Sequence, residues 1–173
     1  MGILILIICV GLGWFAYNRG SSAVMTEVEQ ALLMQAEEAS EIVEKTLGIH
    51  LAVLETIAAR PEIQGMDWEL QQPALLAERD RLEIYGALSV VYPDGSAIHD
   101  TGETLNLSGR SYIAEVLKGK PTVSELLVTT DTRELATIFA VPIKKDGEVQ
   151  GALIARANGR FLKDITDSIS FGN

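Results

Sequence analysis

The chain of 173 residues contains very little cysteine, little histidine and a deficit of positive charge. Its single cysteine, Cys9, excludes an intramolecular disulfide and a cysteine-ligated metal site. The two histidines, His50 and His99, lie far apart in sequence and form no metal-binding spacing. Acidic residues number 24 against 14 lysines and arginines, and the net charge of −10 argues against nucleic acid, which binds a basic face. We therefore expect no metal or other cofactor and no nucleic-acid partner.

The motifs of the common enzyme classes are also missing. Ser108, Ser111 and Ser124 lie outside any G-x-S-x-G pattern, and neither histidine has a recognisable nucleophile partner. The Gly119-Lys120 pair lacks the spacing of a phosphate-binding loop. The sequence therefore predicts a protein that is not an enzyme.

An uncharged apolar run, GILILIICVGLGWFAY, extends from Gly2 to Tyr17. It is slightly shorter than the roughly 20 residues that cross a bilayer, and its last aromatic residues suit a membrane interface. No basic region precedes the run, as one would in a signal peptide. We expect residues 1–19 to be a transmembrane signal anchor, with residues 2–17 in contact with lipid. A cleaved signal peptide is the alternative, and the abrupt apolar start suggests a true N-terminus further upstream.

A long helix is expected from Thr26 to Arg60, because this span contains no proline and a single glycine, and Pro61 ends it. A seam with heptad spacing runs along it, with two polar interruptions. The helix would reach roughly 50 Å, and the pattern fits either packing on the chain's own sheet or a parallel homodimer. The seam positions are Val28, Leu32, Gln35, Ala39, Ile42, Thr46, Ile49 and Val53.

Beyond Pro61 the periodicity changes from helical to strand-like. Short turns join the later runs, so we expect an α+β fold with a five-stranded antiparallel sheet, helices on one side and the long helix packed against it. Ser108 is the expected N-cap of a short helix, with Arg110 in its first turn. The other expected helices cover 68–83 and 159–168, and the short helix lies within 105–121 and begins after Ser108. The expected strands cover 86–101 (two strands around Pro93-Asp94-Gly95), 122–129, 134–143 and 148–157, the last two joined by KKDG.

Three segments resemble a known family: LSGRSYIAEVLKGKPTVSE, ATIFAVPI and GEVQGALIARANGRFLKDI. In their order and spacing they are similar to the membrane-distal half of a double Cache (dCache) domain. This PAS-like module is the extracytoplasmic sensor of bacterial chemotaxis receptors, sensor histidine kinases and diguanylate cyclases. The resemblance covers nearly all of residues 20–173 and implies a Cache sensor domain over 24–170. Residues 171–173 would begin the crossover to a second lobe, so the chain looks like a fragment or a truncated product of a larger receptor.

The resemblance implies a function in signal transduction. A receptor of this family lies in the cell membrane, single-pass in this fragment, binds a small ligand outside the cytoplasm and relays a conformational change through the membrane. A ligand-free dimerisation or scaffold module is the alternative, and a membrane-anchored enzyme is a third. A sensor should contain a concavity that faces Arg110 and Tyr112, whereas in a scaffold Phe139 and its neighbours would fill that space.

The resemblance assigns ligand binding to Arg110 and Tyr112, the Arg-x-aromatic pair of the family. A guanidinium beside a helix N-terminus suits a carboxylate, which supports this assignment independently. The alternative is a surface ion pair of Arg110 with Glu103 or Glu125.

Strand alternation suggests four further wall residues, Val90, Tyr92, Thr137 and Phe139, for which ordinary core packing is the alternative. Amino-acid-binding relatives carry an aspartate on the last strand, and the corresponding position here falls near Arg156 or Ala157. We therefore expect a small anion such as an organic acid rather than an α-amino acid, held by Arg110 with Arg156 assisting.

Overall fold

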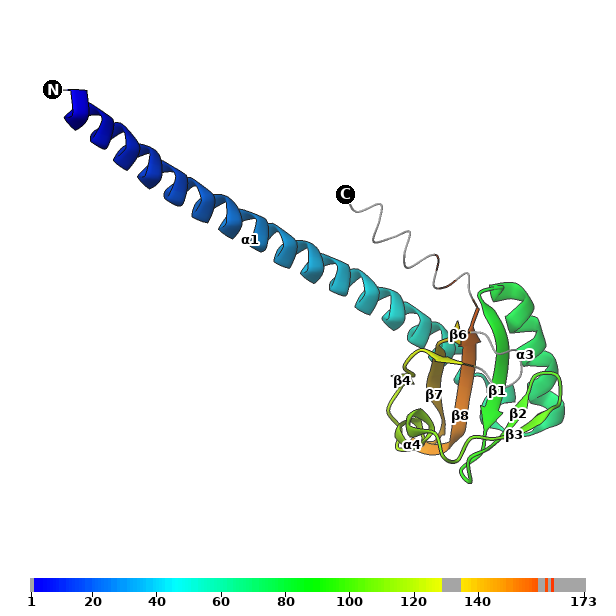
Figure 1. The fold of residues 1–173 in the computed structure, drawn as a ribbon. Helices are drawn as coiled ribbons and strands as arrows, with labels where there is room; N and C mark the ends of the chain where they lie inside the picture. Colours follow the sequence, from blue (N-terminus) through cyan, green and yellow to red (C-terminus); the bar gives the residue numbers. More distant parts are fainter. Residues whose placement is uncertain (1, 129–134, 159–160, 162, 164–173) are drawn as a thin grey trace. The chain divides into compact units, whose positions relative to one another are not determined.

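The structure is a computed structural model that describes the backbone of residues 2–128, 135–158, 161 and 163, with side chains from Gln30 onward. The chain divides into two compact units, Met1–Ile42 and Val43–Asn173, which are described separately. The first unit consists of the beginning of helix α1 (Gly2–Ala58), and the second contains the end of α1 and all the other elements (Figure 1).

Helix α1 is continuous from Gly2 and therefore begins well before the expected Thr26. It ends at Ala58, three residues before Pro61, which begins helix α2 (Pro61–Gln64). The expected signal anchor covers residues 1–19, whose side chains are not among those that the structure describes, so it stays a prediction. Among the residues that the structure describes, no helix is long and apolar enough to span a membrane.

The end of α1 packs on the chain's own sheet. Leu54, Ile57 and Ala58 are buried, and Leu47 and Leu51 pack against the same core. Of the heptad seam, Val53 also packs against this core. The seam residue Ile49 is 63% exposed, as is Leu32 (61%) in the first unit. Packing on the own sheet is thus confirmed for the end of the helix, whereas the homodimer stays a prediction.

Helix α3 (Trp68–Leu82) follows after a short turn. The Asp67 side chain caps it by accepting a hydrogen bond from the Glu69 N–H at 3.0 Å. Buried Glu78 pairs with Arg60, the N-cap residue of α2 just after α1, and with Arg81 one turn along α3. The Arg60–Glu78 pair joins the connection between α1 and α2 to α3.

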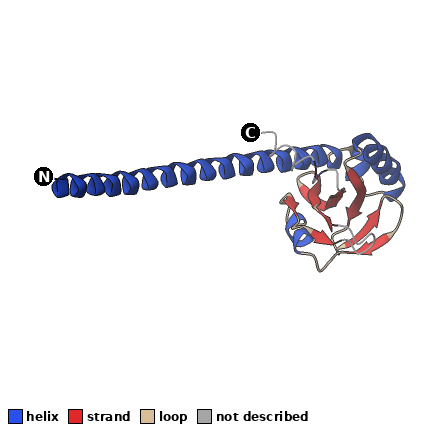
Figure 2. Ribbon diagram, turned by 45° about the horizontal axis from the view of Figure 1, so that its top comes forward, coloured by secondary structure: helices blue, strands red, loops and turns tan. Residues whose placement is uncertain are grey.

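The main sheet has six strands rather than five, in the order β3-β2-β1-β8-β7-β4, with every neighbouring pair antiparallel. Figure 2 shows the strands in red and the helices in blue. The expected strand at 122–129 divides into β4 and β5, and β5 pairs with β6 in a separate two-stranded sheet. A short polar strand, β3, was missed. The strands are β1 (Tyr85–Val91), β2 (Ser96–His99), β3 (Thr104–Asn106), β4 (Thr122–Val123), β5 (Leu127–Val128), β6 (Leu135–Ala136), β7 (Ile138–Lys145) and β8 (Glu148–Ala157).

Both predicted hairpin turns are confirmed. In the β1–β2 turn, Gly95 has a φ of +84° and its N–H donates to the Tyr92 carbonyl at 2.9 Å. In the β7–β8 turn, Asp146 and Gly147 both have positive φ values, 53° and 86°, as a type I′ hairpin requires. The expected last helix at 159–168 lies outside the described residues apart from Phe161 and Lys163.

Helices cover both faces of the sheet, not one side as expected. The core under α1, α2 and α3 contains Phe139 and Leu153, whereas the opposite face carries helix α4 (Ser111–Val116). Ile113 and Val116 of α4 pack with apolar residues of β7 and β8. Two covered faces explain why these central strands are apolar at nearly every position.

Candidate functional site

A cavity of about 100 Å³ lies on the α4 face of the sheet. Its floor comes from alternate residues of the central strands, and its rim comes from β2, β3, β5 and the start of α4. The floor residues are Ala87, Ser89, Ile138, Ile154 and Arg156, and the rim residues are His99, Glu103, Leu105, Leu107, Arg110, Tyr112, Leu127 and Val128.

Arg110 is the N-cap residue of α4, so the expectation that it lies in the first helical turn is wrong. Ser108 does not cap the helix, because its hydroxyl and its N–H both donate to the Asn106 side chain. Helix α4 therefore begins later, at Ser111. Because α4 has only six residues, its macrodipole contributes little beside the guanidinium itself.

The Arg110 side chain is exposed at the cavity rim. In the part of the chain that the structure describes, no ion pair joins it to Glu103, to Glu125 or to any other acid. The alternative of a surface ion pair is thus not found there. The neighbouring Tyr112 is half-buried, and its burial raises its pKa, although the positive charge of Arg110 acts in the opposite direction.

Three of the predicted site residues, Arg110, Tyr112 and Arg156, line the same cavity although Arg156 lies far along the chain. Arg156 lies on β8, opposite Ala87 of β1 and Ile138 of β7. Among the described residues, the lining contains two arginines and one acid, Glu103.

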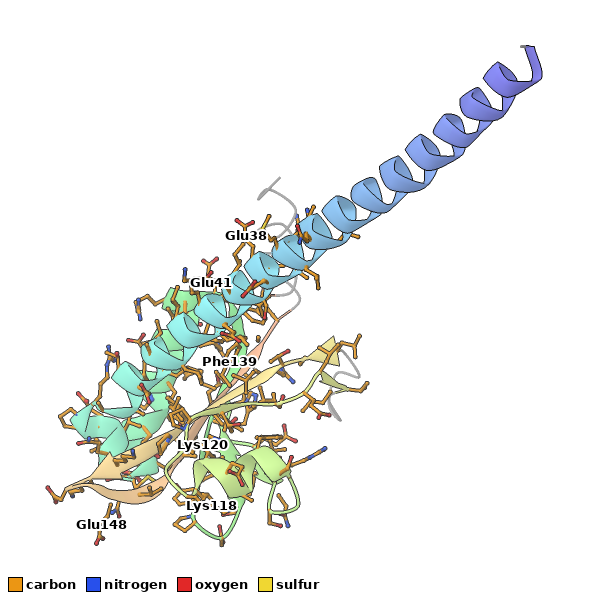
Figure 3. All side chains as sticks on the ribbon, turned by 90° about the vertical axis from the view of Figure 1, so that its left-hand side faces the viewer. Glu38, Glu41, Lys118, Lys120, Phe139 and Glu148 are labelled. Atoms are coloured by element: carbon orange, nitrogen blue, oxygen red, sulfur yellow. The ribbon has the colours of Figure 1, made fainter. Side chains whose placement is uncertain are left out.

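The other four predicted wall residues lie elsewhere. Val90 and Phe139 belong to the core on the opposite face of the sheet, and Tyr92 packs at the edge of that core. Figure 3 shows Phe139 between the sheet and the end of α1, where its ring lies 5.3 Å from that of His50. Thr137 is buried between β6 and β7, and its carbonyl accepts a hydrogen bond from the Ala157 N–H. None of the four lines the cavity.

The sequence reasoning missed His99 and Glu103, which flank the β2–β3 turn at the cavity rim. Both belong to segments that look like ordinary polar turn sequence. Leu88 and Val90 of β1 belong to the face under α1, α2 and α3. Because side chains alternate along a strand, that assignment would have placed Ala87 and Ser89 on the opposite face, which contains the cavity.

A second hollow, of about 540 Å³, lies between α4 and the edge strand β4. Arg110, Tyr112 and Leu127 line both hollows, so the Arg110 side chain stands between them.

No family model and no curated protein sequence matches the chain. Among solved structures it is similar to the sensory domain of the Campylobacter jejuni chemoreceptor Tlp3 (CcmL) with isoleucine bound, at a TM-score of 0.62 and 16% identity over 76% of this chain and 59% of that chain. The ligand-binding domain of Pseudomonas fluorescens chemoreceptor CtaA with L-alanine matches at a TM-score of 0.66 and 13% identity (80% and 63% covered). The V. cholerae histidine kinase DctB sensor domain matches at 0.61 and 14% (79% and 59% covered).

The chain has the fold of a Cache sensory domain. This confirms the predicted α+β Cache fold. The chain spans about three fifths of the length of the three sensory domains. The neighbours in this fold are sensory ligand-binding domains.

A buried carboxylate, that of Asp100, holds together the strands on one side of the cavity. Asp100 is fully buried, and its Oδ2 accepts the Leu88 N–H at 3.1 Å and lies 3.2 Å from Nη1 of Arg79 on α3. The Gln72 amide of α3 also donates to the Asp100 carbonyl. Burial raises the pKa of Asp100, but the neighbouring His99, the Leu88 N–H and the Arg79 charge outweigh it and hold the pKa below its usual value. Asp100 thus fastens β2 to β1 and α3.

Replacing Asp100 tests this support. Because its pKa is lowered in the folded state, its stabilisation is complete above the ordinary aspartate pKa of about 3.9 and is lost as pH falls through the lower folded value. We expect Asp100→Asn to reduce the free energy of unfolding by about 1–3 kcal/mol at neutral pH, since it leaves donors of Arg79 and Leu88 poorly satisfied. Urea unfolding followed by circular dichroism measures this.

The matched control is Asp80→Asn on α3, where the aspartate side chain is 73% exposed and little change is expected. The wild type should lose more stability between neutral and strongly acidic pH than Asp100→Asn does. Equal unfolding free energies for Asp100→Asn and the wild type at neutral pH would contradict the role of Asp100.

Proposed function

We propose that the chain is the ligand-sensing lobe of a bacterial transmembrane receptor and binds a small carboxylate in the cavity beside α4. One observation carries the proposal: the Arg110 guanidinium lies at the rim of an apolar cavity and has no ion pair in the described part of the chain. A guanidinium in this position suits a carboxylate, which accepts two parallel hydrogen bonds from it.

The size and lining of the cavity narrow the ligand class. An engineered cavity of about 150 Å³ holds benzene, which has six heavy atoms, so a cavity of about 100 Å³ suits a ligand of similar or smaller size. Much of the remaining wall is apolar, with Leu105, Leu127 and Ile154. This favours formate, acetate, propionate, glycolate or lactate over larger acids such as citrate.

A ligand-free scaffold is less well supported. In a scaffold, Phe139 would fill the space beside Arg110 and Tyr112, but its ring packs on the other face of the sheet. The similar chemoreceptor domains are sensory and ligand-binding, which also supports a sensor.

A small amino acid is the second candidate. The similar domains of Tlp3 and CtaA contain isoleucine and L-alanine. The last strand lacks the aspartate expected for an ammonium group, but Glu103 brings a carboxylate to the same cavity. Removing the charge of Glu103 should therefore have opposite effects on a simple carboxylate and on an amino acid.

The first test is the loss of the Arg110 charge. We expect Arg110→Ala to weaken binding of the acid that binds best by at least about tenfold, because a hydrogen bond to a charged group contributes about 1.5–3 kcal/mol. Isothermal titration of the full chain in mild detergent with the five small acids, glycine and alanine measures this. The matched control is Lys120→Ala, an exposed cation beyond the end of α4 that does not line the cavity (Figure 3). Unchanged affinity in Arg110→Ala would contradict the proposal.

The second test uses Glu103→Gln to identify the ligand class. If the ligand is a simple carboxylate, removing the negative charge of Glu103 should leave its affinity unchanged or increase it, since one repulsive charge is lost. If the ligand is an amino acid, the ammonium group loses its partner and affinity should fall about tenfold or more. Binding of alanine but of none of the simple acids would overturn the carboxylate in favour of the second candidate.

We further propose that residues 1–19 anchor the chain in the cell membrane with the Cache fold outside the cytoplasm, and that the chain forms a homodimer along the α1 seam. The continuity of α1 from Gly2 to Ala58 supports a relay of ligand-driven movement toward the anchor.

Cysteine crosslinking tests the seam. In a Cys9→Ser background, Leu32→Cys should form disulfide-linked dimers in membranes faster than Leu33→Cys, its equally exposed neighbour off the seam. Equal rates would argue against a dimer along this seam. If the bound acid does not change the crosslinking rate of Leu32→Cys, the proposed relay is contradicted, whereas the dimer is not.

A further inference from the structure

Two opposite charges line the larger hollow between α4 and β4 without pairing with each other. They are Arg110, at the start of α4, and Glu125, which follows β4. In the described part of the chain, no ion pair joins either of them to any residue, whereas the other acid of the lining, Glu115, pairs with Lys118 at 3.0 Å. A cation and an anion that face one hollow unpaired are complementary to a ligand that carries both charges at separate ends.

The strand β4 borders this hollow and is an edge strand of the main sheet. Its neighbour in the sheet is β7, and the Ser124 N–H just after β4 donates to the Ile138 carbonyl at 2.8 Å. Because the main-chain groups alternate in direction along an antiparallel pair, the preceding residue, Val123, directs its N–H and its carbonyl away from β7. In the described part of the chain, neither group has a backbone partner in another element. The outer edge of β4 thus presents one donor and one acceptor.

This outer edge belongs to the hollow. The Val123 side chain packs against the core under α1, α2 and α3, on the face of the sheet opposite to α4. Val123 nevertheless lines the hollow, which leaves its main chain at the strand edge as its contribution. Leu126, whose side chain is 52% exposed, adds an apolar contact to the same lining. The hollow therefore combines main-chain hydrogen-bonding groups, two opposite charges and an apolar surface.

The size of the hollow suits a ligand larger than a small acid. At about 540 Å³ it lies within the range of about 300–1,000 Å³ that is typical of ligand pockets. An engineered cavity of about 150 Å³ holds benzene, so by the same ratio this hollow has room for about twenty heavy atoms. That is enough for a tripeptide of small residues.

We propose that the hollow between α4 and β4 is a second binding site, which takes a short peptide with free ends. The C-terminal carboxylate binds the Arg110 guanidinium, the peptide main chain adds to the edge of β4 at Val123, and the N-terminal ammonium group faces Glu125. A dicarboxylate would bring a second negative charge toward Glu125, and a single amino acid has no peptide group for Val123. The site does not depend on the small acid in the cavity, but the two ligands share Arg110 and therefore exclude each other.

Modified forms of trialanine test the two charged ends. By isothermal titration of the full chain in mild detergent, we expect trialanine with free ends to bind, and its C-terminal amide to bind at least about tenfold more weakly, because the charge-assisted hydrogen bonds to Arg110 are lost. N-acetyl-trialanine should bind about two- to fivefold more weakly, since an exposed ion pair contributes little. Absence of trialanine binding, or equal affinity for trialanine and its amide, would overturn the proposal.

Glu125→Gln tests the partner of the ammonium group. We expect this variant to bind trialanine about two- to fivefold more weakly than the wild type and to bind N-acetyl-trialanine equally well, because that peptide has no ammonium group to lose. The matched control is Glu148→Gln, which changes an exposed acid at the start of β8 that does not line the hollow (Figure 3). Equal weakening of both peptides by Glu125→Gln would contradict the orientation of the peptide.

Amide hydrogen exchange tests the strand edge without a variant that has to fold. We expect exchange of the Val123 N–H to slow at least about tenfold when trialanine saturates the site, because this group gains a hydrogen-bond partner. The Ser124 N–H, which already donates to Ile138, is the internal control and should change little. An unchanged exchange rate at Val123 would overturn the addition of the peptide to β4.

Competition separates this inference from the proposed function. The small acid that binds best should lower the apparent affinity for trialanine, since both require Arg110. Binding of a small acid without binding of trialanine would overturn the second site and leave the carboxylate site intact. Binding of trialanine without binding of any small acid would overturn the proposed carboxylate and leave the second site intact. Simultaneous binding of both at full affinity would overturn the shared role of Arg110.

Discussion

The alternation of side chains along β1, β7 and β8 is the constraint on which the rest of this structure depends. One set of positions, including Leu88, Phe139 and Leu153, faces α1, α2 and α3 and forms the larger core. The other set faces α4 and includes the small residues Ala87 and Ser89 in the cavity floor. Large side chains fill the space under the long helices, whereas small ones leave a space on the α4 side. The small side chains of Ala87 and Ser89 on β1 thus leave room beside Ile138 and Ile154, which form the rest of the floor with Arg156.

The two walls of the cavity differ in how firmly they are held. The wall at β2 is fixed by Asp100, which bonds β1 and α3 at once, and the sheet beneath is covered by an aromatic cluster of Tyr85, Phe139 and Phe161. The opposite wall consists of a six-residue helix and of β5, whose Val128 is 58% exposed. Local stability follows buried apolar contact, so movement costs least on the α4 and β5 side. The firm wall thus carries His99 and Glu103, whereas the weaker wall carries Arg110 and Tyr112.

Local sequence was a sufficient guide where a few adjacent residues determine the geometry. Pro93-Asp94-Gly95 and KKDG contain the residues that hairpin turns require, and the absence of proline before Pro61 predicts the uninterrupted helix. It failed at Ser108, because the Asn106 side chain binds the hydroxyl that would otherwise cap α4. Local sequence also predicts one strand where the structure has β4 and β5. The two strands pair in different sheets, and the local pattern does not indicate which sheet a strand joins.

The sequence by itself determined the order of the elements, the long helix, the two tight turns and the Arg110–Tyr112 pair as binding residues to examine. Only the tertiary structure decided which face of the sheet contains the cavity. Both faces of β7 and β8 are covered, so both sets of alternate positions are apolar. The sequence therefore contains no polar positions that would distinguish one face from the other. An error of one residue in the assignment exchanges the two faces. Val90 and Phe139 were therefore assigned to the cavity but lie in the core. His99, Glu103 and Arg156 meet at one cavity only because the sheet brings distant segments together.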